Sequence, residues 1–141
     1  MTPASIEDWF GINSLFARYA TALDDGDVAG VVGCFTEDAS VESPVVGAYV
    51  GHAQIRRFAE RLARVRQAGA QLRHVISNLT AEVEGDRASA RCYLLTAITR
   101  DGKSALLGPG TYDCELVRTP QGWLFTRRVV AMDHPIVLPG A

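Results

Sequence analysis

The chain lacks several features that mark common classes of protein. It has only three cysteines, Cys34, Cys92 and Cys114, which lie far apart in its 141 residues. An odd number of dispersed cysteines fits buried thiols in a reducing cytoplasm better than a disulfide framework or a zinc site. No apolar run is long enough to cross a bilayer, and residues 1–10 lack the basic and apolar regions of a signal peptide. We therefore expect a cytoplasmic protein with no membrane partner.

An excess of basic residues is also missing. The chain has 14 Lys and Arg against 16 Asp and Glu, and its formal net charge is −2. A nucleic-acid-binding domain usually presents a basic surface to the phosphate backbone. We therefore expect no nucleic-acid partner.

Familiar motifs for cofactor and metal binding are absent as well. The sequence has no P-loop, GxSxG or HExxH motif, and its three histidines do not have metal-ligand spacing. We therefore expect neither a metal nor another cofactor. Hydrophobic residues make up 48% of the chain, enough to fill the core of one domain over residues 1–141.

The first half of the chain has the apolar periodicity of helices. It predicts a first helix over Ser5–Asp24 and a second over Val28–Phe35, with Asp27 as the N-cap of the second. The segment Ala39–Val50 is strand-like but is interrupted by a proline and a glycine. A third helix then begins at Gly51, and we expect its arginine-rich face to be solvated.

The second half alternates between apolar and polar residues, as strands do. The predicted strands are Gln71–Glu84, Arg87–Arg100, Ser104–Arg118 and Gly122–His134. Short turns join them, which indicates an antiparallel meander. Three helices must then cover one face of a curved sheet, giving an α+β fold. The glycines of Gly108-Pro109-Gly110, in mid-strand, predict a bend or bulge.

Among the histidines, His74 has the most unusual setting. Alternation places it on the same strand face as Leu72 and Ile76. Such a histidine is either a buried core residue whose ring nitrogens are hydrogen-bonded or a catalytic base. Asp24 and Asp25 are its natural partners, because acids at a helix C-terminus oppose the helix dipole and so indicate another purpose.

A wider pattern is carried by short motifs that occur in order along nearly the whole chain. They are Tyr19, Leu23-Asp24-x-Gly26-Asp27, Phe35-x-x-Asp38-Ala39, Gly51, Arg73-His74-x-Ile76-x-Asn78, Gly110-x-Tyr112, and Gly122-Trp123-x-Phe125 followed by Arg128. This order closely resembles the SnoaL-like polyketide cyclase and scytalone dehydratase group, within the nuclear-transport-factor-like superfamily. The resemblance implies a cone-shaped, curved antiparallel (mixed) sheet wrapped around N-terminal helices, with an internal apolar pocket. It also implies a homodimer or homotrimer formed through the outer face of the sheet.

The resemblance extends to the reaction. In dehydratase-type members, a histidine of the first long strand pairs with an aspartate at the end of the first helix, and His74 and Asp24 match these positions. Bile-acid dehydratases add a tyrosine five residues before the aspartate, which Tyr19 matches. The general-base aspartate of ketosteroid isomerase would fall at Ser43, which cannot act as that base, and alternation points the adjacent Glu42 to the other face.

These matches lead to a hypothesis of a cofactor-free lyase for a small, largely apolar cyclic substrate. Neutral His74 would remove a proton, since its reference pKa of about 6.5 suits a base at neutral pH. Asp24 would fix its tautomer, and Tyr19 would donate to the leaving group or to an enolate oxygen. Tyr112 is a second candidate donor. Candidates for the pocket wall or the core are Phe16, Leu72, Ile76, Trp123, Phe125 and Met132.

Two alternatives use the same fold. An isomerase or polyketide-type cyclase would handle an enolate in the same pocket, with Tyr19 and Asp24. A non-catalytic small-ligand-binding module would need no chemistry at all. Product mass separates elimination from isomerisation, whereas a His74–Asp24 separation beyond hydrogen-bond distance and a filled cavity would favour the binding module.

Overall fold

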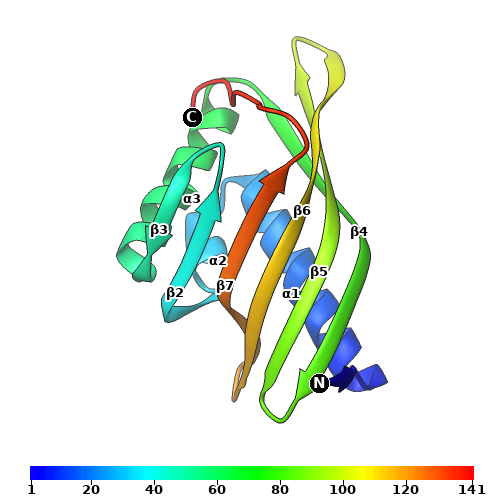
Figure 1. The fold of residues 1–141 in the computed structure, drawn as a ribbon. Helices are drawn as coiled ribbons and strands as arrows, with labels where there is room; N and C mark the ends of the chain where they lie inside the picture. The colour runs from blue at the N-terminus through cyan, green and yellow to red at the C-terminus, as the bar shows by residue number, and fades with distance from the viewer.

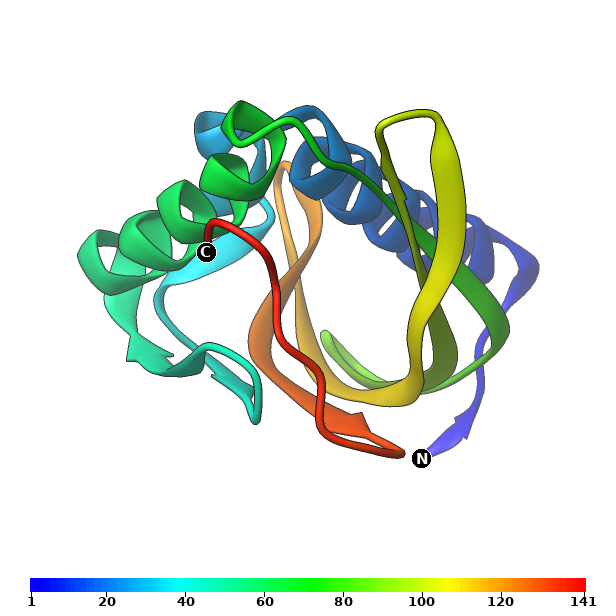
Figure 2. The same ribbon diagram turned by 90° about the horizontal axis from the view of Figure 1, so that it is seen from above.

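The computed structural model describes residues 1–141 and shows a strongly curved sheet with helices lying across its concave side (Figures 1 and 2). The helices are α1 (Ile6–Asp25), α2 (Val28–Val32) and α3 (Gly51–Gln67). The strands are β1 (Thr2–Pro3), β2 (Phe35–Ser43), β3 (Gly47–Val50), β4 (Gln71–Glu84), β5 (Arg87–Arg100), β6 (Lys103–Thr119) and β7 (Gly122–Met132). None of the helices combines the length and the apolar character that crossing a bilayer requires.

The seven strands form one mixed, unclosed sheet in the order β1-β4-β5-β6-β7-β2-β3. Strands β4 to β7 are the predicted antiparallel meander, and β2 joins it by pairing parallel to β7. The predicted α+β class, with helices before a curved sheet, is therefore confirmed. Helix α1 packs mainly on β4, which brings the end of the helix beside the start of that strand (Figure 1).

The ends of the first two helices follow local chemistry. The Ser5 hydroxyl accepts a hydrogen bond from the Asp8 backbone N–H at 3.1 Å, and Gly26 ends α1 in the left-handed conformation at φ 69°. Helix α2 is shorter than predicted and ends at Val32. Phe35, placed in that helix by the sequence prediction, instead opens β2, because it pairs with Phe125 of β7.

The glycines of β6 allow close packing over the strand. The register of β5 against β6 shifts between Thr96 and Ala97, opposite Leu106 and Gly108, so the predicted bend is confirmed. A Cβ at Gly108 would lie 2.9 Å from Ile136 Cγ2, and one at Gly110 would collide with the Ala131 carbonyl oxygen. The C-terminal segment 133–141, called the tail below, can therefore pass close to β6 before it runs from the end of β7 to α3 (Figures 1 and 2).

Aromatic rings fill the centre between α1 and the sheet. Tyr19 of α1 makes edge contacts with Phe35 and Phe125, with ring centroids 5.6 and 5.5 Å apart, and Phe16 lies 5.1 Å from Phe125. Such edge-to-face pairs stabilise beyond the area they bury. This cluster fixes the rotation of α1, and with it the direction in which the last turn of the helix faces.

Candidate functional site

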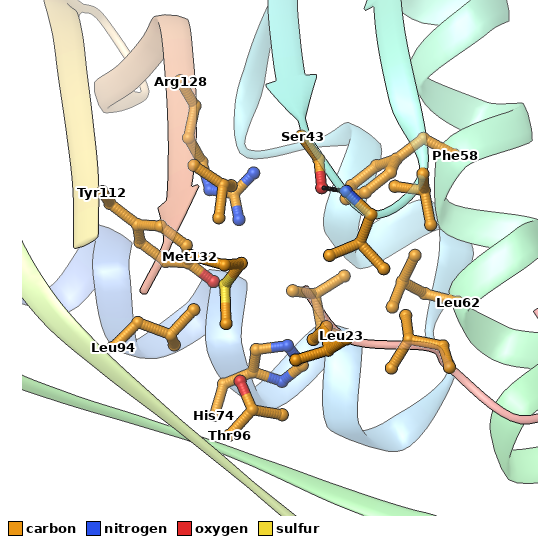
Figure 3. Close-up of a pocket in the computed structure, with 15 residues that line it drawn as sticks. Leu23, Ser43, Phe58, Leu62, His74, Leu94, Thr96, Tyr112, Arg128 and Met132 are labelled. Carbon is orange, nitrogen blue, oxygen red and sulfur yellow. Dashed lines mark hydrogen bonds between the residues drawn. The ribbon is translucent and has the colours of Figure 1, made fainter. Parts of the chain in front are cut away.

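A cavity of about 50 Å³ lies between the end of α1, helix α3, the sheet and the tail (Figure 3). Eleven of its fifteen lining residues are hydrophobic. The lining consists of Leu23, Ser43, Val45, Val46, Phe58, Leu62, His74, Leu94, Thr96, Tyr112, Arg128, Val130, Met132, Ile136 and Leu138. A mainly apolar wall with a few polar groups is typical of a small-molecule site.

His74 and Asp24 form a buried hydrogen-bonded pair at this wall. The two side chains are 8% and 9% exposed, and His74 Nδ1 lies 2.6 Å from Asp24 Oδ1. The His74 backbone N–H also donates to both carboxylate oxygens, at 3.2 and 3.1 Å. Because an ionised carboxylate only accepts, the proton belongs on Nδ1, which leaves the lone pair of the neutral ring on Nε2.

The end of α1 is tied to β4 by further contacts. Asp24 lies in the last turn, where a negative charge opposes the helix dipole. Its carbonyl oxygen accepts hydrogen bonds from Gln71 Nε2 at 2.9 Å and from Arg66 Nη1 at 3.3 Å. These donors satisfy the Asp24 carbonyl at the helix end, and two donors of His74, the backbone N–H and Nδ1–H, satisfy the carboxylate. The placement that looked unfavourable in sequence therefore serves the contact with β4.

Arg128 of β7 is the site residue to which the sequence reasoning assigned no role. It is 2% exposed, and its guanidinium carbon lies 4.4 Å above the ring of Tyr19 and 3.9 Å above that of Tyr112. Its Nε and Nη1 are buried without a hydrogen-bond partner. The structure thus contains a buried cation that no carboxylate neutralises.

The two tyrosines differ in their access to the cavity. Both are fully buried, and burial raises the pKa of each phenol while the Arg128 charge acts in the opposite direction. Both hydroxyls therefore stay protonated at neutral pH and can donate. Tyr112 lines the cavity, whereas Tyr19 lies outside the lining, and its hydroxyl has no partner. Their rings are 6.4 Å apart.

The other predicted wall residues fall into three places. Met132 lines the cavity with His74 and Tyr112. Phe16 and Ile76 border a shallow groove between α1 and β4, on which Asp24 and His74 also open. Leu72, Trp123 and Phe125 are buried in the core, outside the cavity lining.

Ser43 occupies the position at which ketosteroid isomerase would carry its general-base aspartate. Ser43 lines the cavity, and its hydroxyl accepts a hydrogen bond from the Val45 backbone N–H at 3.1 Å. Glu42 is exposed on the other face, 3.6 Å from Arg127. The inward position of β2 therefore carries no acid.

The remaining polar residues have other surroundings. Asp25 is half exposed near Arg66, and Asp27 caps α2 by accepting from the Gly30 N–H at 3.0 Å. His52 Nε2 lies 2.8 Å from the Phe35 carbonyl oxygen, and His134 is exposed. The structure holds no group of three or more His, Cys, Asp or Glu side chains placed to hold a metal ion.

Comparison with known proteins agrees with this fold. Residues 4–129 match the SnoaL-like domain family. The chain belongs to this family. An uncharacterised protein of Mycobacterium tuberculosis, Rv2910c, is 29% identical over 131 residues, which cover 92% of this chain and 88% of that protein.

Solved structures share the fold. A protein from Novosphingobium aromaticivorans, provisionally assigned as an aromatic ring hydroxylase, is 32% identical with a TM-score of 0.78, and the match covers 94% of each chain. A second protein from that organism, provisionally assigned as a scytalone dehydratase, is 19% identical with a TM-score of 0.79, covering 92% of this chain and 86% of that one. At that identity the second likeness establishes the fold alone.

Proposed function

We propose that this SnoaL-like protein is a cofactor-free lyase that eliminates water, or a similar leaving group, from a small, largely apolar cyclic substrate. The observation that carries the proposal is the buried His74–Asp24 pair at the wall of the cavity, with Nδ1 held 2.6 Å from the carboxylate. Neutral His74 removes a proton next to an electron-withdrawing group through Nε2. Asp24 holds the ring and stabilises the imidazolium that forms.

A hydroxyl donor completes the reaction. Tyr112 is the better placed of the two tyrosines, because its side chain and that of His74 point into the same space from β6 and β4 (Figure 3). It donates to an enolate oxygen or to the leaving group, which lowers the energy of the charge that develops there. Tyr19 is the second candidate, since its buried hydroxyl has no partner to give up before it donates.

Substrate entry requires movement of the lining. A cavity of about 50 Å³ is smaller than the ~150 Å³ at which an engineered apolar cavity binds benzene. Ile136 and Leu138 of the tail supply part of the wall. The tail is anchored by the Asp133 N–H, which donates to the Pro109 carbonyl, and no backbone hydrogen bond joins residues 134–140 to the sheet. Opening the tail is therefore the least costly way to admit a ring.

Product mass tests the reaction. Purified protein would be incubated with a panel of β-hydroxy ring ketones, and products would be followed by mass spectrometry. Elimination predicts a product lighter by one water, and His74→Ala should abolish it while leaving the circular dichroism spectrum of a folded protein. Asp25→Asn is the matched control, because Asp25 is adjacent to Asp24 but half exposed. Turnover retained by His74→Ala would refute the proposal.

Two alternative functions predict different experimental results. A product of unchanged mass from the same pocket would favour an isomerase or cyclase that uses Tyr19 and Asp24 on an enolate. The small cavity volume favours a non-catalytic binding module, whereas the tight His74–Asp24 contact speaks against it. Ligand binding without any turnover across the panel would favour the module.

We also propose a homodimer or homotrimer formed through the outer face of the sheet. The large apolar side chains Val75, Tyr93, Leu95 and Leu106 are 42–60% exposed, and the cross-strand partners Val75 and Leu95 lie side by side. Apolar side chains grouped on one face of a sheet are typical of protein interfaces. Analytical ultracentrifugation should give a mass two or three times that of the chain. Leu95→Glu should reduce the measured mass to that of a single chain.

A further inference from the structure

Arg128 is a permanent charge without a counter-ion. A guanidinium does not lose its proton in a protein, so burial cannot be relieved by neutralisation. The acids around β7 are engaged elsewhere: Asp24 binds His74, Glu42 lies outside near Arg127, and Asp113 pairs with Arg91 at 2.8 Å. No carboxylate of the chain forms an ion pair with Arg128.

The aromatic rings around Arg128 satisfy only part of the guanidinium. Tyr19 and Tyr112 lie against it and stabilise the charge by cation–π attraction. The N–H groups lie in the plane of the guanidinium and need acceptors at its edge. Nε and Nη1 have none. Native proteins rarely leave buried donors unsatisfied, and such exceptions point to an absent acceptor.

The surroundings specify which acceptor fits. Arg128 is the only Lys or Arg among the fifteen lining residues, and His74 is already paired with the Asp24 carboxylate. One positive charge balances a monoanion. The planar, forked guanidinium matches the geometry of a carboxylate. The rest of the wall, including Leu94, Val130 and Met132, suits an apolar ring.

We propose that the ligand of this cavity is a ring carboxylic acid whose carboxylate binds Arg128, with the Tyr112 hydroxyl as a second donor. This inference rests on the proposed function only in taking the same cavity as the substrate site. It narrows the substrate from an apolar ring to an acidic one. It also gives the ring an orientation, with the carboxylate toward β7 and the reacting carbon toward His74.

Binding of two matched probes tests the inference. Benzoate and benzamide have nearly the same shape, but only benzoate is charged at neutral pH. NMR titration of the purified protein should show benzoate binding more tightly, by about 10- to 100-fold, the usual value of a hydrogen bond to a charged group. Arg128→Met should remove that preference. Arg127→Met is the control, because Arg127 is the next residue but points outward, and it should keep the preference.

The outcomes separate this inference from the lyase. His74→Ala should keep the benzoate preference, because the carboxylate does not bind His74. Equal affinity of the parent protein for the two probes would overturn the inference, whether or not turnover is found. That measurement needs no variant, so it decides the matter even if Arg128→Met fails to fold. A preference for benzoate that survives in Arg128→Met would overturn it as well.

Discussion

The two polar walls of the cavity contrast sharply. At one wall, Asp24 and His74 share three hydrogen bonds, and every carboxylate oxygen has a donor. At the other, Arg128 is equally buried but has two nitrogen atoms without an acceptor. The first wall is complete in the free protein, as an oriented base must be. The second is complete only when something else supplies an acceptor.

The difference shows how to separate folding from function in one small core. A satisfied polar pair stabilises the protein and loses stability when one partner is removed. An unsatisfied buried charge costs stability, and the protein becomes more stable when the charge is replaced. Replacements on the two walls should therefore move stability in opposite directions while both impair function.

The largest expected effect is on turnover in Asp24→Asn. The amide can still lie beside His74, but its NH2 group favours the wrong ring tautomer and places the proton on Nε2. We expect kcat to fall by about 10³- to 10⁴-fold with little change in melting temperature, as for orienting carboxylates of other histidine bases. Steady-state kinetics on the substrate found by mass spectrometry would measure it. A loss of less than tenfold would mean that Asp24 does not orient the base.

Asp24→Ala should have the largest effect on stability. It leaves the His74 Nδ1–H and the His74 backbone N–H without acceptors, and each unsatisfied buried donor costs about 1–3 kcal/mol. We expect the free energy of unfolding in urea to fall by about 2–6 kcal/mol. Asp25→Ala, at the exposed neighbouring position, should change it by less than about 0.5 kcal/mol. Similar values for the two variants would contradict the structural role of the pair.

Arg128→Met should change stability in the other direction. Methionine fills a similar volume without a charge to desolvate, and such replacements of buried ions are neutral or stabilise by about 1–4 kcal/mol. The lost attraction to the rings of Tyr19 and Tyr112 offsets part of this gain. Urea unfolding with Arg127→Met as the reference would measure it. A clear loss of stability would mean that the two rings, and not a ligand, account for Arg128.

The two walls were not equally visible in the sequence. Periodicity predicted α1, α3 and the four long strands because their apolar faces are continuous. It placed Phe35 in a helix because a short apolar run does not show that β7 will pair with it. The contact between Asp24 and His74 spans 50 residues. The helix-dipole argument left Asp24 and Asp25 as alternative partners, and only the family resemblance selected Asp24.

The inward orientation of Arg128 could not be predicted from the sequence because a bulge in β7 precedes it. From Trp123 and Phe125, strict alternation points Arg127 inward and Arg128 outward. The register against β6 shifts between Glu115 and Leu116, so that Thr126 is an extra residue and the phase reverses. The side-chain pattern before Thr126 does not predict this reversal of phase. Alternation also could not separate cavity wall from core, because Phe125 and Met132 both face inward.

The smallest expected effect concerns an ion pair outside the cavity, where solvent reduces the value of pairing. Arg118 forms an ion pair with Asp8 and a weaker one with Asp86 at 3.2 Å, and it lowers the pKa of the Asp8 carboxyl through a hydrogen bond, against an opposing desolvation effect. A carboxyl whose pKa is lower in the folded state stabilises the protein above its unfolded pKa, near 4. That contribution is lost as the pH falls through the folded pKa.

Comparison of the parent protein with Asp8→Asn by urea unfolding at pH 7 and pH 3 should therefore show a difference at pH 7 that shrinks at pH 3. Because the Arg118 side chain is 40% exposed, we expect no more than about 1 kcal/mol at pH 7. A difference as large as that for Asp24→Ala would mean that the exposure of Arg118 does not weaken its ion pair with Asp8. The proposed difference in stability between the Asp24–His74 pair and the Asp8–Arg118 pair would then be wrong. A small, pH-dependent difference would show instead that the fully hydrogen-bonded Asp24–His74 pair stabilises the protein more than the exposed pair of Asp8 and Arg118 does.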